Sequence, residues 1–442
     1  MKKLFFIGLF ASIILFLVHF YFVGFGVYGD GAGYYSYTHA LYFHHSLDFH
    51  PEFAYYSHFQ IKGKLINRLF WVTTPTVTGL LPDHWSIGPG ILWLPFMLLG
   101  DIVAHLLNLS GSNFPLDGFS PPYEIAVGIG NIIYGYVGLY FLSRFLRNYF
   151  SAKISFLSTL SIYLATNLFY YISIEPNLSH GVSFFSAALF LYYWKKTSLK
   201  KSTIGYILLG LIGGILATIR PYDAVWILIP TIQLIFVILR NKKQYIKLLI
   251  ILLLSWFIGF SPQLLAQKII YGYFWYQPYI FEGVSPTLSL QQNFLWASLF
   301  SLKRGLFFWS PILFFSLLGW LWGWKKYFNL FLIFLLVFIT QWQVIGHWAA
   351  ALSAGFGARM FISSFPLFEV GLAIFYQKIK NLKIVLLILF IFTIWNFLLL
   401  NQFFVDKRLL EGQLTLPEIL EGQIRSVQKI PQKLFFGRGE RN

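Results

Sequence analysis

The stretch from Leu4 to His50 reads LFFIGLFASIILFLVHFYFVGFGVYGDGAGYYSYTHALYFHHSLDFH. Its first part is apolar for about 20 residues, the length that an α-helix needs to cross a bilayer. Asp30 follows a few residues beyond the predicted membrane boundary, among glycines that let a bulky substrate approach and beside the rings of Tyr34 and Tyr35. A carboxylate held at this depth predicts a functional site. The alternative is a turn residue whose side chain caps its own backbone.

The composition is typical of a membrane protein. Of the 442 residues, 57% are hydrophobic and only 11% are charged, whereas soluble proteins have about 25% charged residues. Aromatic residues reach 21%, which suits lipid-facing helices and interfacial belts. There are no cysteines, so the chain has no disulfide framework and its redox compartment cannot be inferred.

The net charge of +17 reflects topology and does not indicate a nucleic-acid partner. The Lys and Arg residues stand in short clusters between apolar runs, which is the positive-inside pattern of cytoplasmic loops. The first apolar run is longer than the core of a signal peptide, so we expect a retained helix with a cytoplasmic N-terminus. The clusters predicted to be cytoplasmic are Arg144/Arg147/Lys153, Lys195/Lys196/Lys200/Lys201, Arg240/Lys242/Lys243/Lys247, Lys325/Lys326 and Lys378/Lys380/Lys383.

These patterns predict an all-α polytopic membrane domain over residues 1–404. We expect eleven spans, with twelve or thirteen as the alternatives. Ten apolar segments follow the first helix, at about 124–143, 153–173, 180–194, 203–219, 222–240, 247–266, 305–324, 328–345, 359–377 and 383–404.

Three further regions follow from this topology. Residues 25–122 form a long first outer loop with interfacial helices, in which the apolar but Gly- and Pro-containing segment 87–109 is expected to be re-entrant, interfacial or a pair of short helices. The outer loop 267–304 is a candidate lid. The tail 405–442 is expected on the outer side as well.

Nearly all polar residues near the apolar segments fall on the outer side, which predicts a single site at the outer membrane boundary. An ionisable group in the bilayer costs about 2.5–3.5 kcal/mol even on the lenient insertion scale. The residues are Asp30, Asp48, Asp83, His84, Glu175, His180, Arg220, Asp223, Glu282, Lys303, Arg304, His347 and Arg359.

Structural roles remain open for each of them. Arg220 and Asp223 flank Pro221 as a helix break would, and Lys303 with Arg304 would serve as an interfacial anchor. Glu175 would cap the helix that follows. Six histidines between residues 39 and 84 match no compact zinc spacing, which favours scattered interfacial histidines. They are His39, His44, His45, His50, His58 and His84.

Six motifs together resemble those of the bacterial polytopic GT-C glycosyltransferases, the class that includes protein O-mannosyltransferases and the aminoarabinose transferases of lipid A. The resemblance extends from the first helix to about Pro366. The motifs are GDGAGYYSY, HWSIGPGILWLPF, EPNLSHGVSFF, IRPYDAVWILIP, LKRGLFFWSP and GFGARMFISSFP.

The resemblance implies an enzyme that moves a hexosyl or pentosyl group, with inversion, from a polyprenyl-phosphate donor to an acceptor on the non-cytoplasmic face. Asp30 matches the acidic residue of the family's first outer loop, and Glu175 is the candidate for a second one. The acceptor would be a glycan, a lipid or a protein. The protein mannosyltransferases have an Asp-Glu pair where this chain has Asp30-Gly31, which argues against a protein acceptor.

The chemistry assigns roles to these residues. An inverting transfer needs a carboxylate to take the acceptor proton, as Asp30 would, and cations to bind the leaving phosphate, for which Lys303, Arg304 and Arg359 are the candidates. Tyr34, Tyr35 and the aromatic residues of 271–281 would stack on a sugar or hold the prenyl chain, and the alternative for these aromatic residues is an interfacial belt. The further candidates for the site are Asp48, His84, Arg220, Asp223 and His347.

No cofactor is required by this scheme. Carboxylates converging with His180 would suit a divalent metal, but a phosphate held by Arg and Lys needs none. The expected location is the inner (plasma) membrane. The main alternative is a transporter or flippase of a lipid-linked or small polar substrate, against which no inverted repeat is apparent; a surface-polysaccharide polymerase or ligase and a scaffold are the others.

Overall fold

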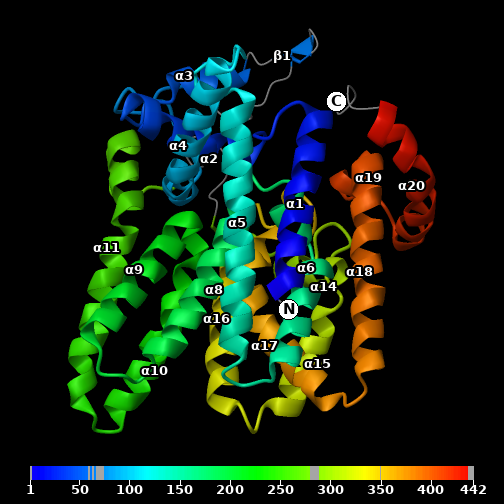
Figure 1. Ribbon diagram of the computed structural model, residues 1–442. Helices are drawn as coiled ribbons and strands as arrows, with labels where there is room; N and C mark the ends of the chain where they lie inside the picture. Colours follow the sequence, from blue (N-terminus) through cyan, green and yellow to red (C-terminus); the bar gives the residue numbers. More distant parts are fainter. Residues whose placement is uncertain are drawn as a thin grey trace.

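The computed structural model describes residues 2–57, 60–61, 64–65, 74–278, 288–348 and 350–436. Within them the chain is a bundle of helices (Figure 1), and the only sheet pairs the two-residue strands β1 (Gln60–Ile61) and β2 (Lys64–Leu65). The predicted all-α class is therefore confirmed. His58, Glu282 and the middle of the expected lid 267–304 lie outside the described residues.

Eight helical segments of the described chain are long and apolar enough to cross a membrane. Three shorter apolar helices accompany them, namely α6 (Ala152–Leu164), α9 (Thr203–Ile219) and α15 (Leu313–Gly323). The fold is thus a helical membrane protein, whereas the count of eleven spans is not confirmed. The eight are α1 (Lys2–Val23), α4 (Ile87–Leu109), α5 (Pro121–Leu146), η2 (Pro221–Ile227) with α10 (Leu228–Leu239), η3 (Lys243–Tyr245) with α11 (Ile246–Tyr271), α16 (Phe328–Gly346), η4 (Arg359–Ser364) with α17 (Phe365–Lys378), and α18 (Leu382–Val405).

Two expected spans are broken by local chemistry. The segment 153–173 divides into α6 and α7 (Leu168–Ser173), because the Thr166 hydroxyl accepts from the Leu168 amide at 3.2 Å in place of a helical carbonyl. The segment 305–324 divides into α14 (Leu306–Trp309) and α15, next to Pro311, which has no amide hydrogen to continue a helix.

The segment 87–109 is one continuous helix, α4, with Pro95 inside it. The expectation of a pair of short helices was therefore wrong, while the re-entrant and interfacial alternatives stay predictions. Proline removes the backbone bond to the Ile91 carbonyl, and α5 contacts the helix one residue further on: Tyr134 donates its hydroxyl to the Leu92 carbonyl at 3.0 Å. Trp93 also donates to the Asn131 side chain of α5 at 2.8 Å, so α4 is fixed along the outer part of α5.

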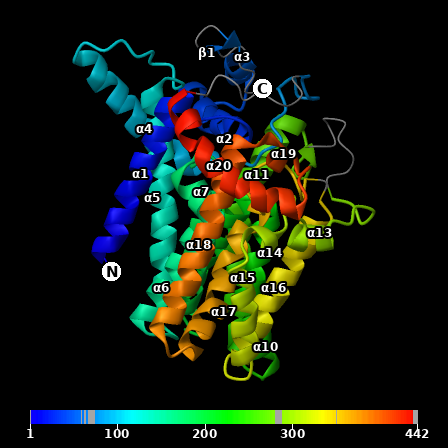
Figure 2. The same cartoon turned by 90° about the vertical axis from the view of Figure 1, so that its right-hand side faces the viewer.

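The five basic clusters lie in or beside the connections at one end of the bundle, the lower end in Figure 1. At the opposite end lie α2 (Asp30–His39), the π-helix η1 (Ala40–His44) and α3 (His50–Ser57). Figure 2 shows the same division from the side. We name these two ends the basic end and the outer end. This separation is the arrangement that the positive-inside rule predicts.

The C-terminal segment is part of the outer end. α19 (Lys407–Glu411) and α20 (Leu416–Phe436) follow α18, and α20 packs against α18 near its outer terminus, with Ile419, Gln423 and Ser426 buried. The Lys303 side chain packs against Gly412. The described part of this tail therefore packs on the bundle and does not project from it.

The helices differ in how far they reach toward the outer end. α5 and α11 have 26 residues each, while α8 (Ser179–Thr197) has 19 and α9 has 17. At 1.5 Å per residue a difference of seven residues is about 10 Å. Gly181, near the start of α8, lies next to the Asn131 carbonyl, ten residues inside α5, or about 15 Å below its outer terminus. The short helices thus form the floor of a recess that the long ones surround.

Candidate functional site

A cavity of about 400 Å³ occupies this recess. Its polar residues come from several elements: Asp30 from the start of α2, Arg220 from the outer end of α9, Arg359 from η4, and Gln263 and Gln267 from α11. The lining is Asp30, Tyr34, His84, Trp85, Ser86, Arg220, Pro221, Tyr222, Phe260, Gln263, Gln267, Trp275, Tyr276, Gln277, Pro278, Leu288, Val344, Trp348, Ala350, Ser353, Arg359 and Met360.

Asp30 forms an ion pair with Arg359 in this cavity. Its Oδ2 lies 2.6 Å from Nη1 of Arg359, and the two side chains are 33% and 10% exposed. Nη2 of Arg359 donates to the Ser353 hydroxyl at 3.0 Å. Among the described residues no hydrogen bond is made to Oδ1 of Asp30, so this oxygen is available to a ligand in the cavity.

Asp30 is positioned by the turn before α2. Gly29 is the N-cap residue of α2 with φ 55°, a conformation that favours glycine. Glu124 of α5 accepts from the amides of Gly26 and Val27 at 2.6 and 3.2 Å. Gly31 packs directly on the Asn177 carbonyl, where a side chain would clash. Gly31 therefore permits close packing within the protein, while no atom lies within 4 Å of the position that a Gly29 side chain would take. That these glycines let a substrate approach stays a prediction.

Arg220 provides a second buried cation. It lies at the C-cap of α9 and is 6% exposed. Its Nε donates to Ser179 at 3.0 Å, its Nη1 donates to the Tyr222 hydroxyl, and its Nη2 lies 3.2 Å from Nε2 of His180. With Arg359 it gives the described lining two cations against one carboxylate. The balance of charge favours an anionic ligand.

Tyr34 lies between these charged groups. Burial raises the pKa of its phenol above the ordinary value, while Arg220 acts in the opposite direction. The phenol is therefore neutral at physiological pH. Tyr34 can donate to or accept from a ligand without adding charge to the site.

Aromatic rings cover the other side of the cavity. Tyr276 stacks on Tyr271 with ring centroids 4.6 Å apart, and the Trp85 and His84 ring centroids are 3.5 Å apart. Trp275 and Trp348 complete the set. Of the aromatic segment 271–281, Trp275 and Tyr276 therefore line the cavity, while Tyr279 to Phe281 lie outside the described residues. Its use in holding a sugar or a prenyl chain stays a prediction.

His180 and Glu175 stand behind the lining. His180 is 1% exposed and packs on Tyr171 with ring centroids 4.2 Å apart, next to Arg220. Glu175 accepts a hydrogen bond from the Tyr28 hydroxyl. His180 therefore supports Arg220, and Glu175 joins the loop before α8 to the loop before α2. The described lining contains neither residue.

Asp223 has a structural environment. Its carboxylate is fully buried and accepts from Ser183 at 2.7 Å, Gln341 at 2.8 Å and Ser363 at 2.6 Å. These partners come from α8, α16 and η4. Asp223 therefore connects the helices whose ends form the floor of the cavity.

Lys303 and Arg304, the expected phosphate ligands, do not line the cavity in the described chain. Lys303 is exposed. Arg304 is buried, donates to the carbonyls of Lys303 at 2.5 Å and Leu409 at 3.5 Å, and lies over the Trp309 ring. Burial lowers its pKa to about 10. The geometry gives Arg304 a role in holding the C-terminal segment.

The other predicted residues divide by position. His84 lines the cavity. Tyr35 is buried and donates to the Gly118 carbonyl at 2.6 Å, while Asp48 accepts from the backbone amide of His50 at the start of α3. His347, at the end of α16, lies with Nδ1 2.9 Å from the Gln343 carbonyl of the same helix. Tyr35, Asp48 and His347 are therefore not in the described lining.

Several lining residues were not predicted. Tyr222 and Met360 flank Arg220, and Gln263 and Gln267 project from α11. Gln263 lies between apolar residues of a long helix and accepts from the Ile87 amide at 3.0 Å. A buried amide in a membrane helix was the available signal, since such groups need a partner.

Comparison of the chain with protein-family models, with curated proteins and with solved structures found no match. A second cavity, of about 550 Å³, lies between α14, α15 and α18. Its described lining is apolar, from Phe300 to Leu398, so it offers no charged group for chemistry. The candidate functional site is therefore the recessed cavity around Asp30.

Proposed function

We propose that the protein is an integral membrane glycosyltransferase of the GT-C type, which transfers a sugar from a polyprenyl-phosphate donor to an acceptor at the outer end. The observation that carries the proposal is the cavity in which Asp30 stands beside Arg359 and Arg220 under a cover of aromatic rings. A carboxylate, two guanidinium groups and apolar walls match the three parts of this reaction: base, anionic leaving group and lipid-linked sugar.

Asp30 is the proposed general base. Oδ2 is held by Arg359 at 2.6 Å, which fixes the carboxylate and leaves Oδ1 directed to a ligand. The acceptor oxygen forms a bond to the anomeric carbon while its proton passes to Oδ1. The bond from that carbon to the phosphate oxygen breaks on the opposite side, and polyprenyl phosphate leaves with the electron pair. Inversion follows from this single displacement.

The guanidinium groups of Arg220 and Arg359 are the proposed phosphate ligands. Guanidinium groups bind phosphate with paired hydrogen bonds, and both cations are buried, where screening by salt is weak. Phosphate bound there would replace the Tyr222 hydroxyl as a partner of Arg220. Arg359 thus has two roles, since it also orients Asp30.

The depth of the cavity suits a membrane-bound donor. The floor lies about 15 Å below the outer terminus of α5, so a prenyl phosphate would enter from the outer leaflet. The proposed location is the inner (plasma) membrane with the basic clusters in the cytoplasm. Trp85, Trp275 and Tyr276 would stack on the sugar or on the first prenyl units.

The test uses purified protein in proteoliposomes that hold a polyprenyl-phosphate sugar labelled in the sugar. The proposal predicts a labelled product other than the donor and an equal amount of released polyprenyl phosphate. A transporter or flippase would move the intact donor across the bilayer without forming either. Relocation of intact donor without cleavage would therefore contradict the transferase.

A further inference from the structure

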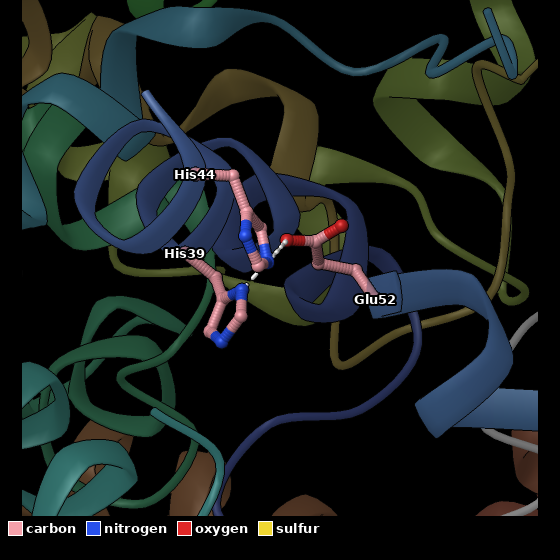
Figure 3. Close-up of side chains that lie close together, drawn as sticks. All are labelled: His39, His44 and Glu52. Atoms are coloured by element: carbon pink, nitrogen blue, oxygen red, sulfur yellow. Dashed lines mark hydrogen bonds and ion pairs between the residues drawn. The ribbon is translucent and has the colours of Figure 1, made fainter. Parts of the chain in front are cut away.

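Three metal-ligating side chains come together at the outer end, away from the cavity around Asp30. They are His39 at the end of α2, His44 at the end of η1 and Glu52 in α3 (Figure 3). Oε1 of Glu52 lies 2.6 Å from Nδ1 of His39 and 3.8 Å from Nε2 of His44. The three candidate ligand atoms all lie within 4.8 Å of one another.

Glu52 is a carboxylate that the local structure does not satisfy. Its side chain is fully buried. Oε2 has no hydrogen-bond partner among the described residues. A buried carboxylate oxygen without a partner is costly, because it has lost its water. A cation between Glu52 and the two histidines would neutralise this charge.

The π-helix explains how two histidines five residues apart meet. In an α-helix residues five apart are turned about 140° from one another, so His39 and His44 would face different sides. The i→i+5 hydrogen bonds of a π-helix instead stack such residues. The ring centroids of His39 and His44 are 5.4 Å apart. His45 then ends the turn in the left-handed region, with φ 50°.

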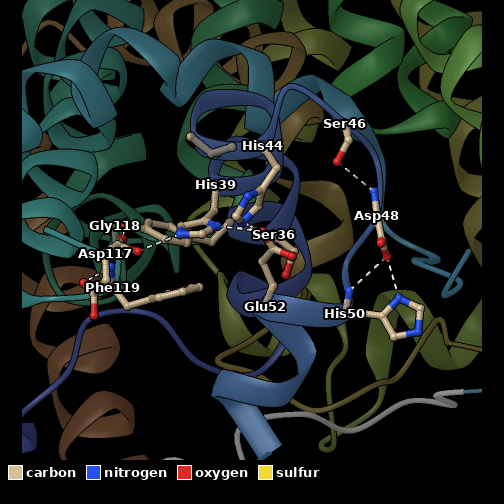
Figure 4. Close-up of polar contacts among 12 residues, drawn as sticks. Ser36, His39, His44, Ser46, Asp48, His50, Glu52, Asp117, Gly118 and Phe119 are labelled. Carbon is tan, nitrogen blue, oxygen red and sulfur yellow. Dashed lines mark hydrogen bonds and ion pairs between the residues drawn. The ribbon is translucent and has the colours of Figure 1, made fainter. Parts of the chain in front are cut away.

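The second nitrogen of His39 has a partner suited to a metal ligand. Nε2 lies 2.7 Å from the Asp117 carbonyl (Figure 4), which can only accept, so Nε2 carries a hydrogen. In a neutral imidazole the Nδ1 lone pair then points at Glu52. A backbone carbonyl behind a ligating histidine is the usual means of fixing its tautomer and orientation in metal sites.

We propose that His39 Nδ1, His44 Nε2 and Glu52 bind one divalent ion of the zinc class. Two imidazoles and a carboxylate suit Zn²⁺, with bonds of about 2.0–2.2 Å. The His44 side chain is 39% exposed, so its ring is free to close on the ion and water completes the coordination. The ion joins η1 to α3 and, through Asp117, to the connection before α5.

The position of the ion gives it a structural role. His39 and Asp30 are nine residues apart at opposite ends of α2, which corresponds to about 13 Å. The ion therefore does not reach Asp30. It holds the outer end of the helix that carries Asp30, since α2, α3 and the connection to α5 meet at the three ligands.

The competing account is an ion pair without metal. If His39 is protonated, Nδ1 donates to Glu52 and Nε2 to Asp117, and both contacts are explained. That account gives His44 no role, because Nε2 of His44 lies 3.8 Å from Oε1 of Glu52, beyond hydrogen-bond distance. The two accounts therefore differ in what a change at His44 would do.

The experiment measures zinc in the full-length protein, purified in detergent with a tag that contains no histidine. After treatment with a chelator, protein is reloaded with Zn²⁺, desalted and analysed by mass spectrometry of the metal. We expect one equivalent in the wild type and at least a tenfold lower affinity in His44→Ala and in Glu52→Gln. His50→Ala is the matched control, because His50 is an exposed histidine paired with Asp48.

The thermal unfolding midpoint, measured with and without Zn²⁺, distinguishes a variant that has lost the metal site from one that has not folded. Zn²⁺ should raise the unfolding midpoint of the wild type and of His50→Ala, but not that of His44→Ala, whose midpoint should equal that of the chelated wild type. Substoichiometric zinc in the wild type would overturn the proposal in favour of the ion pair. Equal zinc in His44→Ala and the control would overturn it as well, because the binding would then be nonspecific.

Discussion

In the proposed mechanism the two oxygens of the Asp30 carboxylate have different tasks. Oδ2 is bound by Arg359, while Oδ1 of this lining residue accepts no hydrogen bond among the described residues. The same separation of tasks holds for Arg359, which contacts Ser353 with its second nitrogen. If Asp30 is the base, as we propose, its ion pair with Arg359 keeps the carboxylate oriented, and the same cation would stabilise the leaving phosphate.

Replacement of Arg220 tests the phosphate assignment. Arg220→Lys retains the charge but loses the fork of donors, so we expect the KM for the donor to rise by about 10- to 100-fold, the equivalent of one charged hydrogen bond. The acceptor KM should change little. Donor titrations at fixed acceptor measure this.

The control for Arg220 is Lys303→Met, which removes an exposed cation outside the described lining. Its donor KM should match the wild type. A rise for Lys303→Met with no change for Arg220→Lys would move the phosphate site to Lys303 and Arg304, as the sequence motif LKRGLFFWSP had indicated.

Asp223 is expected to affect stability and not substrate binding. Asp223→Asn disturbs hydrogen bonds with Ser183, Gln341 and Ser363, and we expect a loss of about 1–3 kcal/mol in the free energy of unfolding. The unfolding midpoint in detergent should fall while the donor KM of the folded fraction stays the same. An unchanged midpoint with a raised KM would place Asp223 at the substrate.

At the scale of elements, α2 is held by close packing at its first turn. Gly31→Ala should lower the unfolding midpoint, because the new methyl group meets the Asn177 carbonyl, and overpacking costs about 1–3 kcal/mol. Gly181→Ala is the matched control: its methyl group would lie 3.6 Å from the nearest atom, an ordinary contact. Equal midpoints for the two variants would contradict this packing.

The sequence predicted the elements whose signals are local. The apolar runs predicted the helical class, which is confirmed. The basic clusters were predicted to share one side, and they lie at one end of the bundle. The bounds of α4 were predicted as the segment 87–109, but Gly88 and Pro95 suggested a break. The helix is continuous, and Tyr134 and Asn131 of α5 contact it beside the proline. Such contacts depend on tertiary packing, which hydropathy does not contain.

The candidate site was predictable only in part for the same reason. Asp30, Arg220 and Arg359 were identified because an ionisable side chain near the bilayer is energetically unfavourable without a partner. All three line the same cavity. Arg304 carries the same charge signal, yet its partners are Leu409 and Trp309. A charge near the boundary indicates that a partner exists, but it does not indicate whether that partner is a substrate or the protein.

At the scale of the whole molecule, the separation of charge makes a topology prediction. The chain has no cysteine, so single cysteines can be introduced without background. In intact cells a membrane-impermeant maleimide should label Asn113→Cys, in the connection between α4 and α5, and should not label Lys200→Cys, in a basic cluster. Labelling of Lys200→Cys would invert the proposed orientation and place the cavity on the cytoplasmic side.

The central claim is that Asp30 serves as the base of a sugar transfer at the outer end. The most direct measurement is the release of polyprenyl phosphate from a panel of labelled polyprenyl-phosphate sugars by folded wild type, Asp30→Asn and the control Asp48→Asn, whose side chain is half exposed at the start of α3. We predict release by the wild type and by Asp48→Asn, and a loss of about 10²- to 10⁴-fold in Asp30→Asn. Undiminished release by folded Asp30→Asn would contradict the account.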